Sequence, residues 1–478
     1  MTQTPRLPAY DRSTLTPGIV HIGVGNFHRA HQAVYLDDLF ALGLDHDWAI
    51  LGAGVRAGDA RMRDALGAQD YLSTVMELEP GNPGARRIGA MIGFIEVQSD
   101  NAALIDAMCQ PAIRIVSLTV TEGGYYIDTA RGGFDAAHPD ILADAANPTR
   151  PVTAFGAIIA ALKVRRDAGL AAFTVMSCDN LPGNGHVTRD TVLGLAGLSD
   201  PAFARWIADK VAFPNGMVDR ITPATGQHER DLAHQFGLQD PVPVSCEPFR
   251  QWVLEDNFPS GRPALEKVGV TFTSDVHAFE AMKIRILNGG HAIIAYPSAL
   301  MGLGFVHEAA NHPLIRAFLQ RLEKEEILPH VPPVPNTDLQ AYLALIVSRF
   351  SNPEIADTTS RLCLDGSNRQ PKFILPSLRD HLATGRMPQG LLLLSALWCR
   401  YCSGTTEAGA VIPANDPDWD RLQSCANAAR LQPEIWLQMT HIYGDLAQNA
   451  EVVACFSAHL NALWAHGTEA TLHHFLNA

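Results

Sequence analysis

The sequence predicts an α/β domain followed by a mostly α-helical domain. The first half alternates strand-like and helix-like segments, a glycine-rich turn follows the first predicted strand, and helical patterns rich in Ala and Leu dominate from about residue 280. The chain has 478 residues, of which 47% are hydrophobic, and is therefore long enough for two domains with sizeable cores.

The first half favours a parallel sheet with crossover helices. Short apolar runs bounded by polar loops are typical of buried strands, and their alternation with helices indicates parallel pairing. The predicted strands cover residues 18–22, 48–51, 114–120 and 172–177, and the predicted helices between them cover residues 33–40 and 154–168.

The second half has helical periodicity. A proline-rich break at 329–335 is expected to be a loop inside this domain. We place the domains at 1–280 and 281–478, with the active site in the cleft between them. The predicted helices cover residues 313–327, 338–350, 390–401 and 450–466.

A glycine turn lies between the first strand and the following helix. Gly23 and Gly25 form the first part of a dinucleotide-binding fingerprint, in which glycines let the backbone approach a pyrophosphate. His28 replaces the third glycine of the usual pattern. A Rossmann-type domain is the prediction, and a strand-to-helix turn without a ligand is the alternative.

The second strand leads to the candidate ribose site. An acid usually follows the glycines by roughly 20 residues. Here that strand ends without a carboxylate, and Asp59 comes slightly later, between Arg56 and Arg61. Asp59 would hold the ribose hydroxyls of NAD, whereas either arginine would accept the 2′-phosphate of NADP. The residues themselves leave this choice open.

One short segment carries a lysine, an asparagine and a histidine. If it is an α-helix, Asn288 lies about 140° and His291 about 80° from Lys283 around the axis, so all three share one broad side. Lysine can serve as a base where its pKa is lowered, and an amide can support a developing alkoxide. The alternatives are an ordinary snorkelling lysine and a satisfied surface histidine.

Two other chemistries for alcohol oxidation lack support. No cluster of Cys and His suggests zinc, so we expect no metal, and none of the nine tyrosines has a lysine four residues later. The CxxC at Cys399 and Cys402 stands alone and is interpreted as packing. Of the three common chemistries for alcohol oxidation with a nicotinamide, the residues therefore favour the one in which a lysine acts as the base.

The net charge of −14 argues against a nucleic-acid partner. The N-terminus lacks the apolar core of a signal peptide, and the run 391–399 is shorter than the ~20 residues that span a bilayer. We therefore expect a cytoplasmic protein without a membrane partner. No heptad seam is sustained, so a monomer is expected.

Five ordered motifs resemble those of the long-chain, polyol-specific dehydrogenases, the mannitol dehydrogenase family. They span roughly residues 18 to 375. The motifs are Gly23–His31, Thr121–Tyr125, Ser177–Asn180, Phe213–Pro223 and Lys283-x4-Asn288-x2-His291.

The resemblance implies roles for individual residues. Lys283 would be the general base, Asn180 and Asn288 the oxyanion-stabilising pair, and His291 a substrate-orienting residue. Asp219 would bind substrate hydroxyls or brace the site, with a buried ion pair to Arg220 as the alternative. The remaining implied positions are Arg361 and Arg369 for substrate, Gly23, Gly25, Asn26, Phe27, His28, Arg29 and Asp59 for cofactor, and Glu122 and Glu280 for a proton path.

The implied activity is NAD-dependent, zinc-independent interconversion of D-mannitol and D-fructose. D-arabinitol and D-sorbitol are further expected substrates. A reductase of fructuronate or tagaturonate in the same family is one alternative, which the two arginines keep open. Leu364 stands where some relatives have a polar residue, which leaves the choice of polyol open. A non-catalytic nucleotide-binding protein is the alternative of another class.

Overall fold

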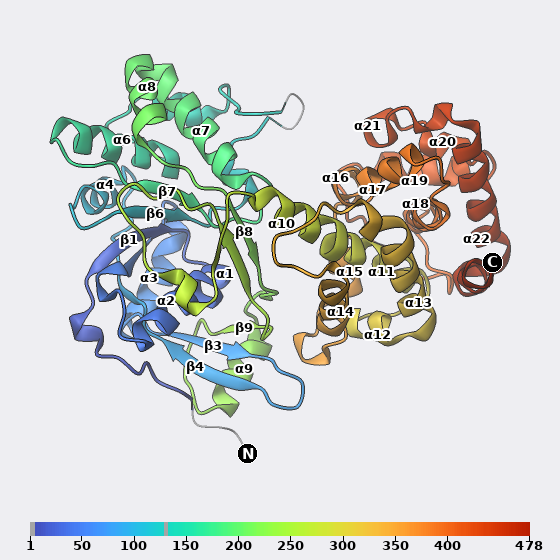
Figure 1. The fold of residues 1–478 in the computed structure, drawn as a ribbon, viewed down its shortest axis with the longest axis horizontal. Coiled ribbons are helices and arrows are strands. Elements are labelled where there is room, and N and C mark those ends of the chain that lie inside the picture. The colour runs from blue at the N-terminus through green and yellow to red at the C-terminus, as the bar shows by residue number, and fades with distance from the viewer. Residues whose placement is uncertain (1–4, 129–131) are drawn as a thin grey trace. The chain divides into compact units, whose positions relative to one another are not determined.

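The computed structural model describes residues 5–128 and 132–478, and the chain divides into two compact units. Unit 1 is Met1–His277 and unit 2 is Ala278–Ala478, so the division falls inside the helix α10 (Val276–Met282). Figure 1 shows strands and helices in unit 1, in blue to green, and helices in unit 2, in yellow to red. The predicted fold class is confirmed.

A parallel sheet of five strands organises unit 1. Its order is β5-β2-β1-β6-β7, and every neighbouring pair is parallel. The strands are β1 (Pro17–Ile22), β2 (Ala49–Ala53), β5 (Met91–Phe94), β6 (Ile115–Leu118) and β7 (Thr174–Ser177). The four predicted strands are confirmed, and β5 is an addition at the edge.

Helices cover the two faces of this sheet (Figure 1). Successive side chains of a strand point to opposite faces of the sheet, so one strand contributes residues to two hydrophobic cores. Ile19 of β1 packs into one core with helix α2, whereas Val20 packs into the other with α6. The helices are α1 (Asn26–Ala30), α2 (Gln32–Ala41), α3 (Ala60–Gly67), α4 (Ala102–Met108), α5 (Pro139–Ala146), α6 (Ala154–Asp167), α7 (Asn184–Ser199), α8 (Pro201–Lys210) and α9 (Gln227–Gln235).

Two three-stranded mixed sheets complete unit 1, and the sequence did not predict them. Their orders are β4-β3-β9 and β11-β10-β8. Val75 of β3 pairs with Val244 of β9. The two residues are far apart in the sequence, so a local sequence pattern does not predict their pairing. The strands are β3 (Ser73–Glu77), β4 (Gly84–Ile88), β8 (Gly216–Asp219), β9 (Val244–Cys246), β10 (Gln251–Leu254) and β11 (Thr271–Phe272).

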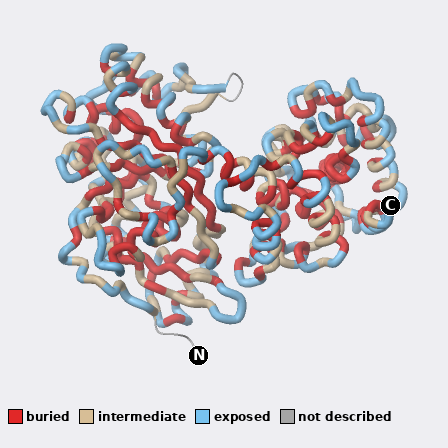
Figure 2. Tube along the Cα trace, viewed as in Figure 1, coloured by how far each residue is buried: buried red, intermediate tan, exposed pale blue. Residues whose placement is uncertain are grey.

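Unit 2 is built around a buried helix, α18, which packs along α22. Figure 2 shows buried stretches throughout this unit. Cys399 and Cys402 lie inside α18, and burial raises the pKa of both thiols well above its usual range, as expected of packing residues. The helices are α11 (Gly289–Leu300), α12 (Val306–Asn311), α13 (Pro313–Leu322), α14 (Leu339–Phe350), α15 (Thr359–Leu362), α16 (Gly366–Phe373), α17 (Leu375–Ala383), α18 (Gln389–Cys402), α19 (Trp419–Ala429), α20 (Glu434–Leu437), α21 (Thr440–Tyr443) and α22 (Ala450–Asn477).

Two segments of unit 2 are π-helical. They are η6 (Lys283–Asn288), between α10 and α11, and η7 (Glu323–Ile327), which follows α13. The two segments contact each other. The α-helical geometry expected for Lys283 to Asn288 is therefore wrong, because each π turn takes in an extra residue. π turns inside helices are frequent at functional sites.

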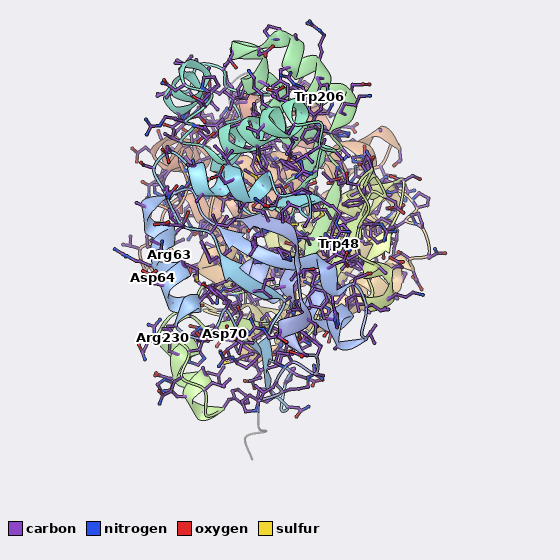
Figure 3. All side chains as sticks on the ribbon, turned by 90° about the vertical axis from the view of Figure 1, so that its left-hand side faces the viewer. Trp48, Arg63, Asp64, Asp70, Trp206 and Arg230 are labelled. Atoms are coloured by element: carbon purple, nitrogen blue, oxygen red, sulfur yellow. The ribbon has the colours of Figure 1, made fainter. Side chains whose placement is uncertain are left out.

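Ion pairs and one buried tryptophan lie in the outer layer of unit 1. Arg63 and Asp64 of α3 pair at 2.8 Å and lie on its outer side (Figure 3). Trp48, also labelled there, precedes β2 and has the Arg114 guanidinium 3.5 Å from its ring centroid. Exposed ion pairs such as Arg63–Asp64 stabilise the fold little, whereas Trp48 is part of the core. Within the described part of the chain, no helix has both the length and the apolar character needed to cross a membrane.

Candidate active site

The strand order of the parallel sheet reverses between β1 and β6. From β1 the chain adds β2 and β5 on one side, and β6 and β7 on the other. Ligands of open α/β sheets bind at the carboxyl ends of the strands beside such a reversal. Gly23 follows β1 and Thr119 follows β6, so the predicted glycine turn lies at this point.

The glycine turn meets the steric demands of a dinucleotide loop. Gly23 has φ +99°, and a Cβ there would lie 2.2 Å from the Thr119 carbonyl oxygen, so only glycine fits. Gly25 is different: a Cβ at this residue would have the Gly23 oxygen as its nearest neighbour, at 3.9 Å. The missing side chain of Gly25 thus leaves open space beside the backbone, which suits a pyrophosphate.

His28 fills the place of the third glycine by stacking. Its ring lies 3.5 Å from that of His21 on β1, with 12° between the planes. His21 bonds Ser117 Oγ at 2.8 Å and Thr119 Oγ1 at 2.9 Å, which joins β1 to β6. Burial lowers the pKa of His21 to about 3. Two flat neutral rings therefore provide the close helix-to-strand packing that glycine normally allows.

The other loop side chains hold the loop in shape. Asn26 donates to the Pro223 carbonyl at 3.0 Å and to Thr225 Oγ1 at 2.9 Å. Arg29 is buried and donates to Asn26 Oδ1 at 2.8 Å. Phe27 stacks on His31 with 4.7 Å between ring centroids. These contacts make Asn26, His28 and Arg29 supports of the loop, and their direct contact with a cofactor stays a prediction.

Asp59 lies near the end of β2, where a ribose acid is expected. Its Oδ2 accepts from the Arg56 backbone N–H at 3.0 Å, and its side chain folds against Gly54. A Cβ at Gly54 would lie 2.3 Å from Asp59 Cβ, so the Asp59 side chain can occupy this position only because residue 54 is glycine. Arg56 and Arg61 are exposed.

Asp179 joins the ends of β6 and β7, and sequence reasoning gave it no role. Its carboxylate accepts from the N–H groups of Val120 and Thr121, each at 3.0 Å, and from the Tyr125 hydroxyl at 2.7 Å. Burial raises its pKa. The predicted residues Asn180, which is exposed, and Glu122, also exposed, flank this connection. The hydrogen bonds of Asp179 thus join two of the five motifs, Thr121–Tyr125 and Ser177–Asn180, in space.

Asn184 is a second connector that the sequence did not reveal. Its amide donates to the Gly216 carbonyl at 2.8 Å and to the Asp179 carbonyl at 3.1 Å. It also accepts from the Gly216 N–H at 2.9 Å. The strand β8, which ends at Asp219, is thus fixed to the loop that carries Asn180.

Asp219 and Arg220 are both buried at the end of β8. The Arg220 guanidinium donates to Glu77 Oε1 at 2.7 Å and to the Ala30 carbonyl at 2.6 Å, beside the glycine loop. Its ion pair is therefore with Glu77 on β3. Arg220 ties three separate elements together next to Asp219.

Unit 2 carries the lysine, the second asparagine and the histidine. Lys283 is buried and Asn288 is half-buried, at the two ends of the π segment η6. A π turn bonds residues five apart, so Lys283 and Asn288 come closer to one face than the 140° separation of an α-helix allows. His291 follows in the first turn of α11 and stacks on Phe350, with 4.2 Å between ring centroids.

The remaining predicted residues differ in their surroundings. Glu280 on α10 is buried. Arg361 Nε donates to Asp357 Oδ1 at 2.5 Å, and this pair raises the pKa of the guanidinium. Arg369 Nη1 donates to the Leu362 carbonyl at 3.2 Å. The helices α15 and α16, which carry the two arginines, contact α11, and α16 also contacts η6.

No group of three or more His, Cys, Asp or Glu side chains is placed to hold a metal ion among residues 5–128 and 132–478. The sheet reversal and its glycine turn define unit 1 as a dinucleotide-binding domain of the Rossmann type, and the buried lysine with its neighbours belongs to a helical second unit. This architecture is that of a nicotinamide-dependent oxidoreductase.

Comparison with known proteins gives the family. The model of the mannitol dehydrogenase Rossmann domain matches residues 17–267, and that of the mannitol dehydrogenase C-terminal domain matches residues 275–464. The chain belongs to the mannitol dehydrogenase family. It is 71% identical to mannitol 2-dehydrogenase of Cereibacter sphaeroides over 478 residues, which is 100% of both chains.

Two solved structures share the whole fold. The ternary complex of Pseudomonas fluorescens mannitol 2-dehydrogenase with NAD and D-mannitol is 45% identical, with a TM-score of 0.86 over 99% of this chain and 96% of that one. Substrate-free D-sorbitol dehydrogenase is 35% identical, with a TM-score of 0.92 over 98% of this chain and 97% of that one. The predicted family and enzyme class are confirmed.

Proposed function

We propose that the chain is an NAD-dependent mannitol 2-dehydrogenase that interconverts D-mannitol and D-fructose. The observation that carries the proposal is full-length identity of 71% to a mannitol 2-dehydrogenase, together with likeness to a structure that holds NAD and D-mannitol. NAD, when bound, accepts the hydride from carbon 2. The open space at Gly25 and the carboxylate of Asp59 fit this cofactor.

The proposed chemistry assigns the proton to Lys283. Removal of hydride from a carbinol carbon needs a base at the hydroxyl, because the oxygen must lose its proton as the carbonyl forms. Lys283 is buried at the start of the π segment η6. Asn180 and Asn288 would donate to the oxygen as negative charge develops, without competing for the proton.

Substrate orientation is assigned to His291 and Asp219. The stack on Phe350 fixes the plane of the His291 ring, so its hydrogen bonds to a polyol would have one direction. Asp219 is held at the end of β8 by the pairing of that strand with β10. Glu122 and Glu280 are the proposed proton path, and Arg361 and Arg369 are proposed contacts to distant hydroxyls.

The pairing of Arg361 bears on the rival substrate class. A hexuronate carries a carboxylate and would need a cation that is available to it. The Arg361 guanidinium already faces Asp357 through two of its nitrogens. The pairing of Arg361 therefore favours a neutral polyol, while Arg369, which donates to a backbone carbonyl, keeps the hexuronate as the alternative. D-arabinitol and D-sorbitol are proposed as further substrates, and likeness to a D-sorbitol dehydrogenase supports the second.

One assay series tests the proposal. NADH formation is measured with mannitol, arabinitol and sorbitol, and NADH oxidation with fructose and fructuronate, all with and without EDTA. We expect turnover of mannitol and of fructose, and we expect EDTA to leave the rate with each substrate unchanged. Loss of activity on chelation would contradict the metal-free chemistry, and turnover of fructuronate alone would reassign the substrate. Absence of any turnover would favour a binding protein.

A further inference from the structure

Glu323 is a buried carboxyl group that the proposed chemistry does not use. It begins the π segment η7 and has 0% exposure. Neither carboxyl oxygen has a hydrogen-bond partner among the described residues. Burial raises the pKa of Glu323 well above its usual range, which favours the neutral form of the group.

Glu326, in the same segment, is a buried carboxyl group whose oxygens both accept hydrogen bonds. Its two oxygens accept from the N–H groups of Gly390 and Leu391 at 2.7 and 2.8 Å. These bonds hold the first turn of α18, so Glu326 has a structural role. Glu323 has no such bonds. An apolar side chain of similar size in its place is expected to make the folded protein more stable.

The place of Glu323 connects it to the candidate active site. A Cβ at Gly290 would lie 3.4 Å from Glu323 Oε1 and 3.3 Å from Phe350 Cε2. His291 follows Gly290 and stacks on the same Phe350. The absence of a side chain at Gly290 therefore lets the carboxyl approach the backbone between Asn288 and His291.

We propose that Glu323 is a positioning residue for the reaction, and that its carboxyl group supports the Asn288–His291 turn from behind Gly290. This inference rests on the proposed function. A carboxyl group that keeps its proton can donate one hydrogen bond and accept others. A polar group that weakens a core without local compensation is typical of functional sites.

A comparison of Glu323→Leu with Glu323→Gln tests the proposal. Leucine removes the polar group and fills the space, whereas glutamine keeps a neutral donor and acceptor. We expect E323L to raise the melting temperature and to lower kcat with mannitol at least ~10-fold, because loss of geometry at reacting groups costs rate. E323Q should restore kcat to within about twofold of the wild type. The Kd for NADH should stay unchanged in both.

Leu319→Met is the matched control. Leu319 Cδ1 lies 3.5 Å from the same Cβ position at Gly290, but it offers no hydrogen bond. This volume-conserving change should leave kcat unaltered. If E323L does not fold, Glu323→Met replaces it with the same expected loss of kcat.

The outcomes separate this inference from the proposed function. Wild-type protein that turns over no polyol would overturn both. Wild-type turnover with full kcat in E323L would overturn the positioning role alone. Loss of kcat in E323Q equal to that in E323L would also overturn it, because a neutral hydrogen-bonding group would then not suffice.

Discussion

The Tyr125 hydroxyl lies 2.7 Å from Asp179 Oδ2 and 2.6 Å from Ser177 Oγ, so one buried phenol joins the loop after β6 to the end of β7. Burial raises the pKa of Tyr125 well above its usual range, so the hydroxyl stays a donor at every physiological pH. Asn180 follows directly, and its backbone position depends on this junction.

Tyr125→Phe should loosen the Asn180 loop. The change leaves the buried Asp179 with one donor fewer, which costs about 1–3 kcal/mol of the free energy of unfolding. We expect a lower melting temperature and a kcat reduced by roughly 10-fold with mannitol, because Asn180 is no longer held in place. Tyr126→Phe is the control and should leave kcat unaltered. Full activity in Tyr125→Phe would show that Asn180 is positioned by other contacts.

Lys283→Ala removes the proposed base. We expect kcat to fall at least ~100-fold, the usual scale for loss of a general base, while NADH still binds. Stopped-flow kcat across pH 6 to 10 and fluorescence titration of NADH measure the two effects. A near-normal rate at every pH would assign the base to another residue.

Asn288→Ala and Asn180→Ala remove the proposed oxyanion donors. Each should lower kcat by about 10²–10³ and change KM for mannitol much less, because the bond strengthens only as charge develops on oxygen. The double variant should lose less than the product of the two single effects, since residues that act as a unit are non-additive. A change confined to KM would make these asparagines ordinary substrate contacts.

Gly25→Ala tests the space reserved for the cofactor. Apart from its chain neighbours, a methyl group there meets no atom of the described residues closer than 3.9 Å, so the melting temperature should not change. The Kd for NADH should rise at least ~10-fold, because the backbone could no longer approach the pyrophosphate. Gly84→Ala is the control, because the methyl group of alanine would also lie in open space at that position. An unchanged Kd would move the pyrophosphate away from this turn.

The histidines behind the glycine loop should make the fold sensitive to acid. His21 has its pKa lowered by burial from 6.5 to about 3, so the fold holds it neutral while the unfolded chain binds a proton below pH 6.5. Its contribution to stability is therefore present above pH 6.5 and is lost as the pH falls towards 3. One such group costs roughly 2 kcal/mol between pH 8 and pH 5.

His21→Asn tests this contribution. Melting temperatures of the variant and the wild type are compared at pH 8 and at pH 5. The variant should be less stable than the wild type at pH 8, because a stacked and hydrogen-bonded ring is lost, yet it should lose less stability on acidification. Equal losses in the two proteins would show that His21 does not carry the acid sensitivity. His28 and His31, whose pKa values are also lowered by burial, remain as further sources of acid sensitivity.

The sequence by itself determined the local elements and the family. Apolar runs and helical periodicity are local signals, so the strand before Gly23, the helix at 154–167 and the long buried helix α18 were predicted. Gly23 was predicted from its place in a Gly-x-Gly turn between a strand and a helix, and the structure shows that its φ and its closeness to Thr119 leave no room for a side chain. Five ordered motifs gave the enzyme class.

Only the tertiary structure decided how distant segments meet. The pairing of β3 with β9, the Tyr125–Asp179 junction and the Arg220–Glu77 ion pair each join residues far apart in the chain, and their formation depends on packing that no local pattern records. The π turn from Lys283 to Asn288 is a similar case, because helical periodicity does not distinguish it from an α-helix. The sequence thus supplied the candidate reacting groups, while burial and long-range hydrogen bonds fix the segments that carry them.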